Sequence, residues 1–516
     1  MKPNVVVFLV DDMGYGDASC LNPDGRISTP NYDRLAAEGM TFTDAHSSSA
    51  VCSPSRYGLL TGRYNWRSTL QSGIVNPFGD PLIARDRLTA GGLLQRHGYR
   101  TGCIGKWHLG MGWDFEETDA FLPDRDTYRS EVFPHDREAT DAELEIWREA
   151  FARPTTGGPT TRGFDYYFGV DVPNWPPFCY IENDRTVGIP SEFLPARMLE
   201  HHQASIPGPA MPYWHFEQLL PTWAKKADAF IGESVGRDKP FFLYLPMTSP
   251  HTPLAVNPEW IGKSGLESLY ADLVMETDAI FGRVLASLDR YGVADDTLVL
   301  FTSDNGCAPY IGVEEMEAQG HFPSGRYRGY KSDAWDGGHR IPCIARWPGV
   351  ASPGSTTDHI VCLTDLMATL ADIIGDTLPD SAAEDSVSLL PLLRGENRAV
   401  REHVIHHSIS GKFAIRDRRW KLVLCPGSGG WSKRDDEAAA EGLPLVQLYD
   451  MESDPEERHN LESDRRDVVR RMLGELKRIV AAGRSTPGES QSNDVEVDIW
   501  KLHTMPGVEP AVLDDY

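Results

Sequence analysis

Three short runs of apolar residues, each followed at once by polar residues, constrain the fold of this sequence more than any other feature. The runs are VVVFLV at 5–10, FFLYLPM at 241–247 and TLVLFT at 297–302. Continuous apolar runs of this length are typical of strands that are buried on both faces of a parallel sheet. Helical patterns lie between them, at 31–39, 89–97 and 266–288. This alternation of strand and helix predicts an α/β fold.

The polar clusters that follow these runs predict a single shared site. They read DD at 11–12, SPHTP at 249–253 and DNG at 304–306. In open α/β sheets ligands bind beyond the carboxyl ends of the strands, and all three clusters fall there. We therefore expect the clusters to meet in space, although long stretches of sequence separate them.

Four oxygen ligands stand at two of the predicted strand ends: Asp11, Asp12, Asp304 and Asn305. A chain turns where a strand ends, so that adjacent side chains such as Asp11 and Asp12 can reach one point. Carboxylate and amide oxygens suit Ca²⁺ or Mg²⁺ far better than zinc. The alternative for the adjacent acids is that they cap the next turn.

The charge of the chain limits its partners. A formal net charge of -26 repels nucleic acid and anionic membrane surfaces, so we expect neither as a partner. An anionic substrate would need a local pocket of positive charge. Single lysines and histidines are usually solvated surface, but prolines on both sides hold His251 in a stiff turn. The candidates for such a pocket are Arg56, Lys106, His108, His251 and Lys331.

Two long segments lack the pattern of sheet and helix. Residues 112–163 are rich in acids and proline, and residues 171–221 hold aromatic residues and histidines amid prolines. We predict that both are excursions from the sheet that shape the mouth of a substrate site. Trp175, His201 and Trp214 are candidates for substrate contacts, whereas the alternative is that these aromatic residues form a small core of their own.

The character of the sequence changes after residue 376. Two short alternating strands, at 412–417 and 420–425, precede a charged helix near 467–482. We predict a catalytic domain at 1–380, a small α+β domain at 381–484 and an extended tail at 485–516.

The amino-terminal apolar run is too short for a membrane span, and no cleavage site of small residues follows it. The sequence therefore predicts a cytoplasmic protein, or a periplasmic or secreted one if a leader has been removed.

Eight cysteines are scattered along the chain without a CxxC pair, which favours free thiols over a disulfide scaffold or a zinc site. Cys52 lies where an extended segment meets the predicted start of a helix. A helix N-terminus stabilises a thiolate, so a cysteine nucleophile is one interpretation and a buried structural thiol is another. Neither explains the proline at 54 and the arginine at 56.

The string CSPSR at 52–56, with LTGR at 60–63, resembles the signature of the type I sulfatases. In this family, which is related to alkaline phosphatase, the cysteine of CxPxR is oxidised to Cα-formylglycine. The resemblance implies a large, mixed, mostly parallel sheet sandwiched by helices, with a smaller C-terminal α+β domain that has an antiparallel sheet. It also implies one bound Ca²⁺ ion, and a formylglycine-generating enzyme as the partner for maturation.

The resemblance further implies a role for each candidate residue. The calcium ligands of the family are matched by Asp11, Asp12, Asp304 and Asn305, with the modified residue that replaces Cys52 as another. The catalytic residues are matched by Cys52, Arg56, Lys106, His108, His251 and Lys331.

The implied reaction is the hydrolysis of an aryl or carbohydrate sulfate monoester to an alcohol and inorganic sulfate. The aldehyde at position 52 is hydrated to a geminal diol, and one of its hydroxyls attacks sulfur as the alcohol departs. His251, helped by Lys331, protonates the leaving oxygen. His108 then takes the proton of the second hydroxyl, sulfate is expelled, and the aldehyde reforms.

Three other functions remain open. A phosphonate or phosphate ester hydrolase could use the same site. A non-catalytic anion-binding relative would be expected to lack a ligand or a catalytic cation, yet none is missing here. A cysteine-based redox protein would need a partner for Cys52, and no second cysteine lies near it in the sequence.

Overall fold

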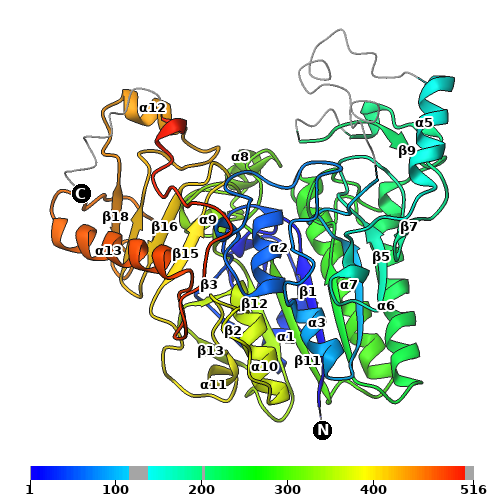
Figure 1. Ribbon diagram of the computed structural model, residues 1–516, viewed down its shortest axis with the longest axis horizontal. Helices are drawn as coiled ribbons and strands as arrows, with labels where there is room; N and C mark the ends of the chain where they lie inside the picture. Colours follow the sequence, from blue (N-terminus) through cyan, green and yellow to red (C-terminus); the bar gives the residue numbers. More distant parts are fainter. Residues whose placement is uncertain (1, 115–137, 200–203, 506–516) are drawn as a thin grey trace.

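A ten-stranded sheet forms the centre of the protein (Figure 1). The computed structural model describes residues 2–114, 138–199 and 204–505. In spatial order the strands are β13 (Ser355–Thr357), β2 (Met40–Phe42), β12 (Cys343–Arg346), β11 (Thr297–Ser303), β1 (Asn4–Val10), β10 (Phe241–Pro246), β4 (Arg100–Lys106), β5 (Tyr166–Val170), β6 (Ile181–Glu182) and β7 (Arg185–Thr186). Strands β11, β1, β10, β4 and β5 run parallel, whereas β12 and the edge strands β6 and β7 pair antiparallel. The predicted mixed, mostly parallel sheet is confirmed.

Helices cover both faces of this sheet. One face packs against α1 (Pro30–Glu38), α6 (Leu219–Val235) and α7 (Leu269–Arg290), and the other against α2 (Cys52–Thr61), α3 (Ala90–Arg96), α10 (Leu366–Ile374) and α11 (Leu390–Leu393). Strand β1 sends Val6 and Phe8 into the first core, and Val5 and Val7 into the second. Because both faces of β1 are buried, its sequence is apolar throughout.

A second sheet of four antiparallel strands forms the C-terminal part, which lies at the left of Figure 1. Its strands are β15 (Val404–His407), β16 (Phe413–Arg416), β17 (Trp420–Val423) and β18 (Gln447–Asp450). Helix α13 (Arg466–Ala482) packs on one face of this sheet through Val469, Leu473 and Leu476. The antiparallel sheet and its helix agree with the prediction, and the domain boundary near residue 380 stays a prediction.

Two further strand pairs and four further α-helices complete the described elements, apart from short 3-10 helices. They are the strand pairs β3 (Ala45–His46) with β14 (Val361–Cys362) and β8 (Glu192–Phe193) with β9 (Pro209–Ala210), and the helices α5 (Asp141–Phe151), α8 (Val313–Ala318), α9 (Asp336–His339) and α12 (Asp435–Ala440). Among the residues that the structure describes, no helix combines the length and the apolar character that a membrane span requires.

The predicted excursion at 171–221 is only partly outside the sheet. Its strands β6 and β7 form a hairpin that extends the sheet beyond β5, with Gly169 opposite Ile181. Strands of two residues leave no periodic pattern, which is why the sequence did not reveal them. Of the excursion at 112–163, the described part contains α5, and residues 115–137 lie outside the described residues.

Buried ion pairs join the two sheets. Lys421 on β17 reaches across to Asp336 on α9 and to Glu457, with its Nζ 2.8 Å from a carboxylate oxygen of each. All three side chains are inaccessible to solvent. Nearby, Arg416 on β16 pairs with Asp44 at 2.9 Å. Charges that lie out of water in this way must be matched by opposite charges, so the network fixes how the two sheets meet.

We predict that Lys421→Met lowers the free energy of unfolding by about 3–5 kcal/mol, because two buried carboxylates lose their ammonium partner. Lys433→Met is the matched control, since Lys433 pairs with Glu441 at the surface and its loss should cost at most about 1 kcal/mol. Urea unfolding followed by tryptophan fluorescence measures both. Equal midpoints for the two variants would show that the network contributes nothing specific.

Candidate active site

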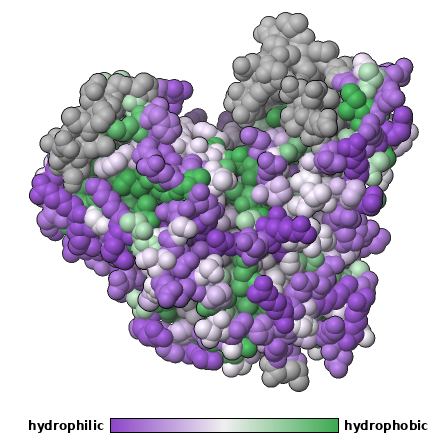
Figure 2. Space-filling view, viewed as in Figure 1, coloured by the Kyte–Doolittle hydropathy of each residue, from purple (hydrophilic) through white to green (hydrophobic). Residues whose placement is uncertain are grey.

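The predicted site residues come from the carboxyl ends of neighbouring parallel strands. Asp11 and Asp12 follow β1, Asp304 and Asn305 follow β11, and Lys106 is the last residue of β4. In Figure 1 β1 runs upward from the N-terminus, so these ends lie at the upper side of the sheet. Figure 2 shows the surface on that side hollowed between the C-terminal part and the lobe that carries α5.

The backbone turns sharply at Asp12, which has a φ of 67°. This left-handed conformation is uncommon for a residue with a side chain, and a local hydrogen bond steadies it: the Asp12 N–H donates to Asp304 Oδ1 at 3.2 Å. Because of the turn, Asp11 and Asp12 both face the same space rather than opposite faces of the sheet. The expectation that neighbouring acids meet at this strand end is therefore confirmed geometrically.

Three buried cations neutralise three buried carboxylates here. Arg56 lies 2.8 Å from Asp304 and 3.2 Å from Asp11. Lys106 Nζ lies 2.7 Å from Asp11, and Lys331 Nζ lies 2.6 Å from Asp12. None of these side chains is more than 5% exposed. Three of the predicted cations therefore meet at one point, but the paired carboxylates offset their charges.

Cys52 lies at the centre of this cluster as the first residue of α2. Its sulfur is within 4.8 Å of carboxylate oxygens of Asp11, Asp12 and Asp304 and of a ring nitrogen of His251. Burial raises the pKa of the Cys52 thiol to about 12, so the helix N-terminus does not produce a thiolate. All eight cysteines are free, as predicted, and a redox or simple thiolate role for Cys52 finds no support.

Two histidines flank the cluster with different partners. His251 lies 3.6 Å from Asp12 through Nε2, while its Nδ1 is 2.6 Å from the carbonyl oxygen of Thr252. His108 has Nε2 3.1 Å from the carbonyl of Val75, and its Nδ1 has no hydrogen-bond partner among the described residues. Burial lowers the pKa of both imidazoles, to about 4 for His251.

The oxygen atoms of the cluster fit a hard divalent cation. Asn305 Oδ1 is buried and accepts no hydrogen bond from the described residues, and Asp11 Oδ1 has only its 3.2 Å ion-pair contact with Arg56. Burial, and secondly the charge of Asp11, raise the pKa of Asp304 to about 7, so this carboxylate is costly to hold ionised without a further cation. Unpaired oxygens and crowded carboxylates are what Ca²⁺ coordination would relieve.

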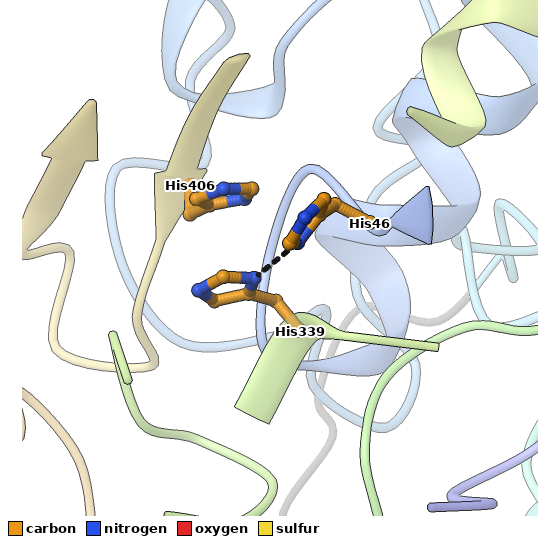
Figure 3. Close-up of side chains that lie close together, drawn as sticks. All are labelled: His46, His339 and His406. Atoms are coloured by element: carbon orange, nitrogen blue, oxygen red, sulfur yellow. Dashed lines mark hydrogen bonds between the residues drawn. The ribbon is translucent and has the colours of Figure 1, made fainter. Parts of the chain in front are cut away.

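A second group of possible metal ligands, the histidine cluster of His46, His339 and His406, lies between the two sheets (Figure 3). His46 Nδ1 is 3.0 Å from His339 Nδ1. However, the rings of His339 and His406 stack with centroids 3.6 Å apart and planes at 9°. Lone pairs in parallel planes cannot converge on one ion, and Lys421 Nζ lies 3.1 Å from His339 Nε2. The cluster is therefore a buried polar junction rather than a metal site.

The aromatic candidates of the 171–221 segment divide into two. Trp175 lies beside the site, because its ring meets that of His108 edge-on with centroids 5.7 Å apart. Trp175 also packs with Val172 and Ile206 in a small cluster of the segment, as the alternative expected. Trp214 packs against Tyr180 in the large core on one face of the central sheet. His201 lies outside the described residues.

The sequence analysis missed Tyr310. Burial raises its pKa, and the groups that act on it include Lys331, Cys52 and the side chain of Thr252. Tyr310 follows β11 by a few residues, in the segment that leaves Asp304 and Asn305, so its position after a functional strand end was the available signal.

The chain is similar in sequence to known proteins. The sulfatase family model matches residues 3–376, and a model described as the C-terminal part of N-sulphoglucosamine sulphohydrolase matches residues 331–482. The chain is 30% identical to N-acetylgalactosamine-6-O-sulfatase of Bacteroides thetaiotaomicron, over 91% of this chain and 92% of that protein. It is also 30% identical to human arylsulfatase A, over 89% of this chain and 83% of that protein.

A solved structure that is titled for the metabolism of multiple glycosaminoglycans by Bacteroides thetaiotaomicron superposes with a TM-score of 0.76. The two chains are 28% identical, and the match covers 93% of this chain and 99% of the chain in that structure. Family model, relatives and fold agree with the motif at Cys52. The chain belongs to the sulfatase family of the alkaline phosphatase superfamily, and it is an enzyme that hydrolyses sulfate esters.

Proposed function

We propose that the enzyme hydrolyses a sulfate monoester of a carbohydrate, with residue 52 in its formylglycine form and one Ca²⁺ ion in the site. The observation that carries the proposal is the buried set of Arg56, Lys106 and Lys331 around Cys52. Each of the three cations is paired with a carboxylate, so a divalent cation bound to the same carboxylates would give the site the net positive charge that an anionic ester needs in a chain with a net charge of -26.

The relatives favour a carbohydrate as the alcohol. One is named for N-acetylgalactosamine-6-O-sulfate, and the superposed structure comes from work on glycosaminoglycans. The arylsulfatase relative is similar over a comparable length, so aryl sulfates serve as model substrates.

Asp11, Asp12, Asp304 and Asn305 would hold the metal ion, with residue 52 beside them. A Ca²⁺ ion bound there would act as a Lewis acid and would polarise both the attacking oxygen and the sulfuryl oxygens. The charges of the three carboxylates and the three cations cancel. A bound divalent ion therefore leaves the site with a net positive charge, which attracts the ester and stabilises the negative charge that develops on its oxygens.

Residue 52 would act as the nucleophile only after conversion. A hydrated aldehyde supplies two hydroxyl groups, of which one can attack sulfur and the other can later release the product. The raised pKa of the Cys52 thiol supports this requirement, because the unconverted side chain is a protonated and weak nucleophile.

His251 would donate the proton to the leaving oxygen. The contact of its Nδ1 with the Thr252 carbonyl orients the ring, so that Nε2 points into the site toward Asp12. Burial and Lys331 lower the pKa of His251, but the negative charge of a bound ester acts in the opposite direction. Substrate binding therefore favours the protonated ring that a general acid needs.

His108 would serve as the base in the second step. With Nε2–H donating to the Val75 carbonyl, the unpartnered Nδ1 keeps a lone pair. Because burial lowers its pKa, the ring is neutral and able to accept a proton from residue 52. Trp175 packs against this ring, and we propose that the 171–221 segment forms part of the substrate wall.

We predict that active enzyme carries formylglycine at position 52, which makes the peptide that contains it lighter by ~18 Da than its cysteine form. Cys52→Ser should keep the fold and lose turnover, because a serine has no second hydroxyl for the release step. Peptide mass spectrometry beside an activity assay measures both. Full activity in protein whose Cys52 is wholly unmodified would overturn this mechanism.

We predict that Asp11→Asn weakens Ca²⁺ binding by about 100-fold, since it removes one of three charged ligands. Titration calorimetry on chelator-treated protein measures the affinity. Asp289→Asn, which changes an exposed carboxylate that pairs with Arg34, should leave it unchanged. An unaltered Ca²⁺ affinity in the Asp11 variant would exclude this site.

We predict that the effect of His251→Ala depends on the leaving group. A sugar alkoxide needs a proton to depart, so kcat/KM for a sugar sulfate should fall by about 10²–10⁴-fold. The loss for 4-nitrophenyl sulfate should be at least about tenfold smaller, because nitrophenolate departs without help. His97→Ala removes a partly exposed histidine that pairs with Asp376, and it should affect neither substrate. Equal losses of kcat/KM for both esters would show that His251 is not the general acid.

A further inference from the structure

We propose that Trp431, together with Tyr310, forms a stacking platform for the pyranose ring of the sulfated sugar. Trp431 belongs to the C-terminal part of the chain, in the loop between β17 and α12. The inference rests on the proposed function and adds to it the surface that recognises the alcohol.

The loop that carries Trp431 is fixed to the segment that carries Lys331. The backbone N–H groups of Trp431 and Ser432 donate to Asp333 Oδ1 at 3.0 and 3.2 Å. The Trp431 N–H also lies 2.9 Å from Ser332 Oγ, and the Ala334 N–H donates to the Ser428 carbonyl at 2.7 Å. Asp333 is fully buried and two residues from Lys331, so both loops form one rigid unit beside the reacting atoms.

The contact between the loops is too close for any side chain at position 430. A Cβ atom on Gly430 would lie 2.5 Å from both the Ser332 carbonyl oxygen and Asp333 Oδ1. Glycine at this position therefore lets the loop approach, and the next residue is a tryptophan that is 43% exposed. A large apolar ring that is held rigidly in solvent loses the benefit of burial, which a ligand would restore.

Tyr310 connects this ring to the site. The ring centroids of Trp431 and Tyr310 are 5.8 Å apart, with planes at 41°. Tyr310 in turn lies among Lys331, Cys52 and Thr252, the residue next to His251. The pair therefore connects the surroundings of Lys331 and Cys52 to the exposed ring of Trp431.

The chemistry of the pair suits a sugar ring. The C–H groups on one face of a pyranose form an apolar surface that packs on an aromatic ring, and the hydroxyls at its rim stay in water. A short alkyl sulfate has no pyranose face to pack on these rings. The platform should therefore matter for sugar sulfates and not for the smallest esters.

Binding and turnover of N-acetylgalactosamine 6-sulfate and ethyl sulfate test the proposal. Calorimetry uses full-length Cys52→Ala protein, which has no nucleophile at position 52, so the binding result does not depend on catalysis. Trp431→Ala should weaken binding of the sugar sulfate by about tenfold and change binding of ethyl sulfate by less than about twofold. Trp431→Phe should restore most of the affinity for the sugar sulfate. Phe322→Ala, which removes a ring of similar exposure elsewhere, should change neither ligand.

In converted enzyme the same Trp431→Ala change should raise KM for the sugar sulfate more than it lowers kcat. Equal weakening of both ligands, or no weakening of the sugar sulfate, would overturn the platform. If wild-type converted enzyme turns over neither ester, the proposed function fails, and the binding measurements still decide the role of Trp431.

Discussion

The structure depends on holding six ionised side chains out of water at one edge of a sheet. Arg56, Lys106 and Lys331 are buried away from solvent, and a carboxylate within hydrogen-bond distance compensates the charge of each. Loss of one partner from such a set leaves an uncompensated charge that costs about 3–5 kcal/mol. The central sheet has a hydrophobic core on each face, and this rigid scaffold keeps the six side chains in place.

The same constraint explains why the C-terminal part belongs to the site. The loop with Trp431 binds Asp333, two residues from Lys331, and the ion pairs of Lys421 and Asp336 continue this junction deeper between the sheets. The histidine cluster lies within it, with the stacked rings of His339 and His406 contributed by both sides. The proposed platform for the sugar and the junction of the two sheets therefore lie at one boundary.

The sequence predicted the strands whose residues are all in one environment, the protein interior. Strands β1, β10 and β11 are buried on both faces, so their apolar runs were unmistakable, and the polar residues just after them proved to meet. Strands β6 and β7 could not be predicted, because two residues carry no period. For the site, Cys52 and its neighbours were predictable from a motif. Tyr310 stands after a predicted strand end, which was its one signal in the sequence, and the contacts that bring Tyr310 and Trp431 together become visible only when the chain is folded. Their places depend on tertiary contacts that no local pattern encodes.

The central claim is that this charged pocket is built for a sulfate ester. The most direct test compares kcat/KM of fully converted enzyme for a sulfate, a phosphate and a phosphonate ester of the same alcohol. The account predicts that the sulfate ester is hydrolysed with the highest kcat/KM. A phosphate or phosphonate ester that is hydrolysed more efficiently than the matched sulfate would contradict it.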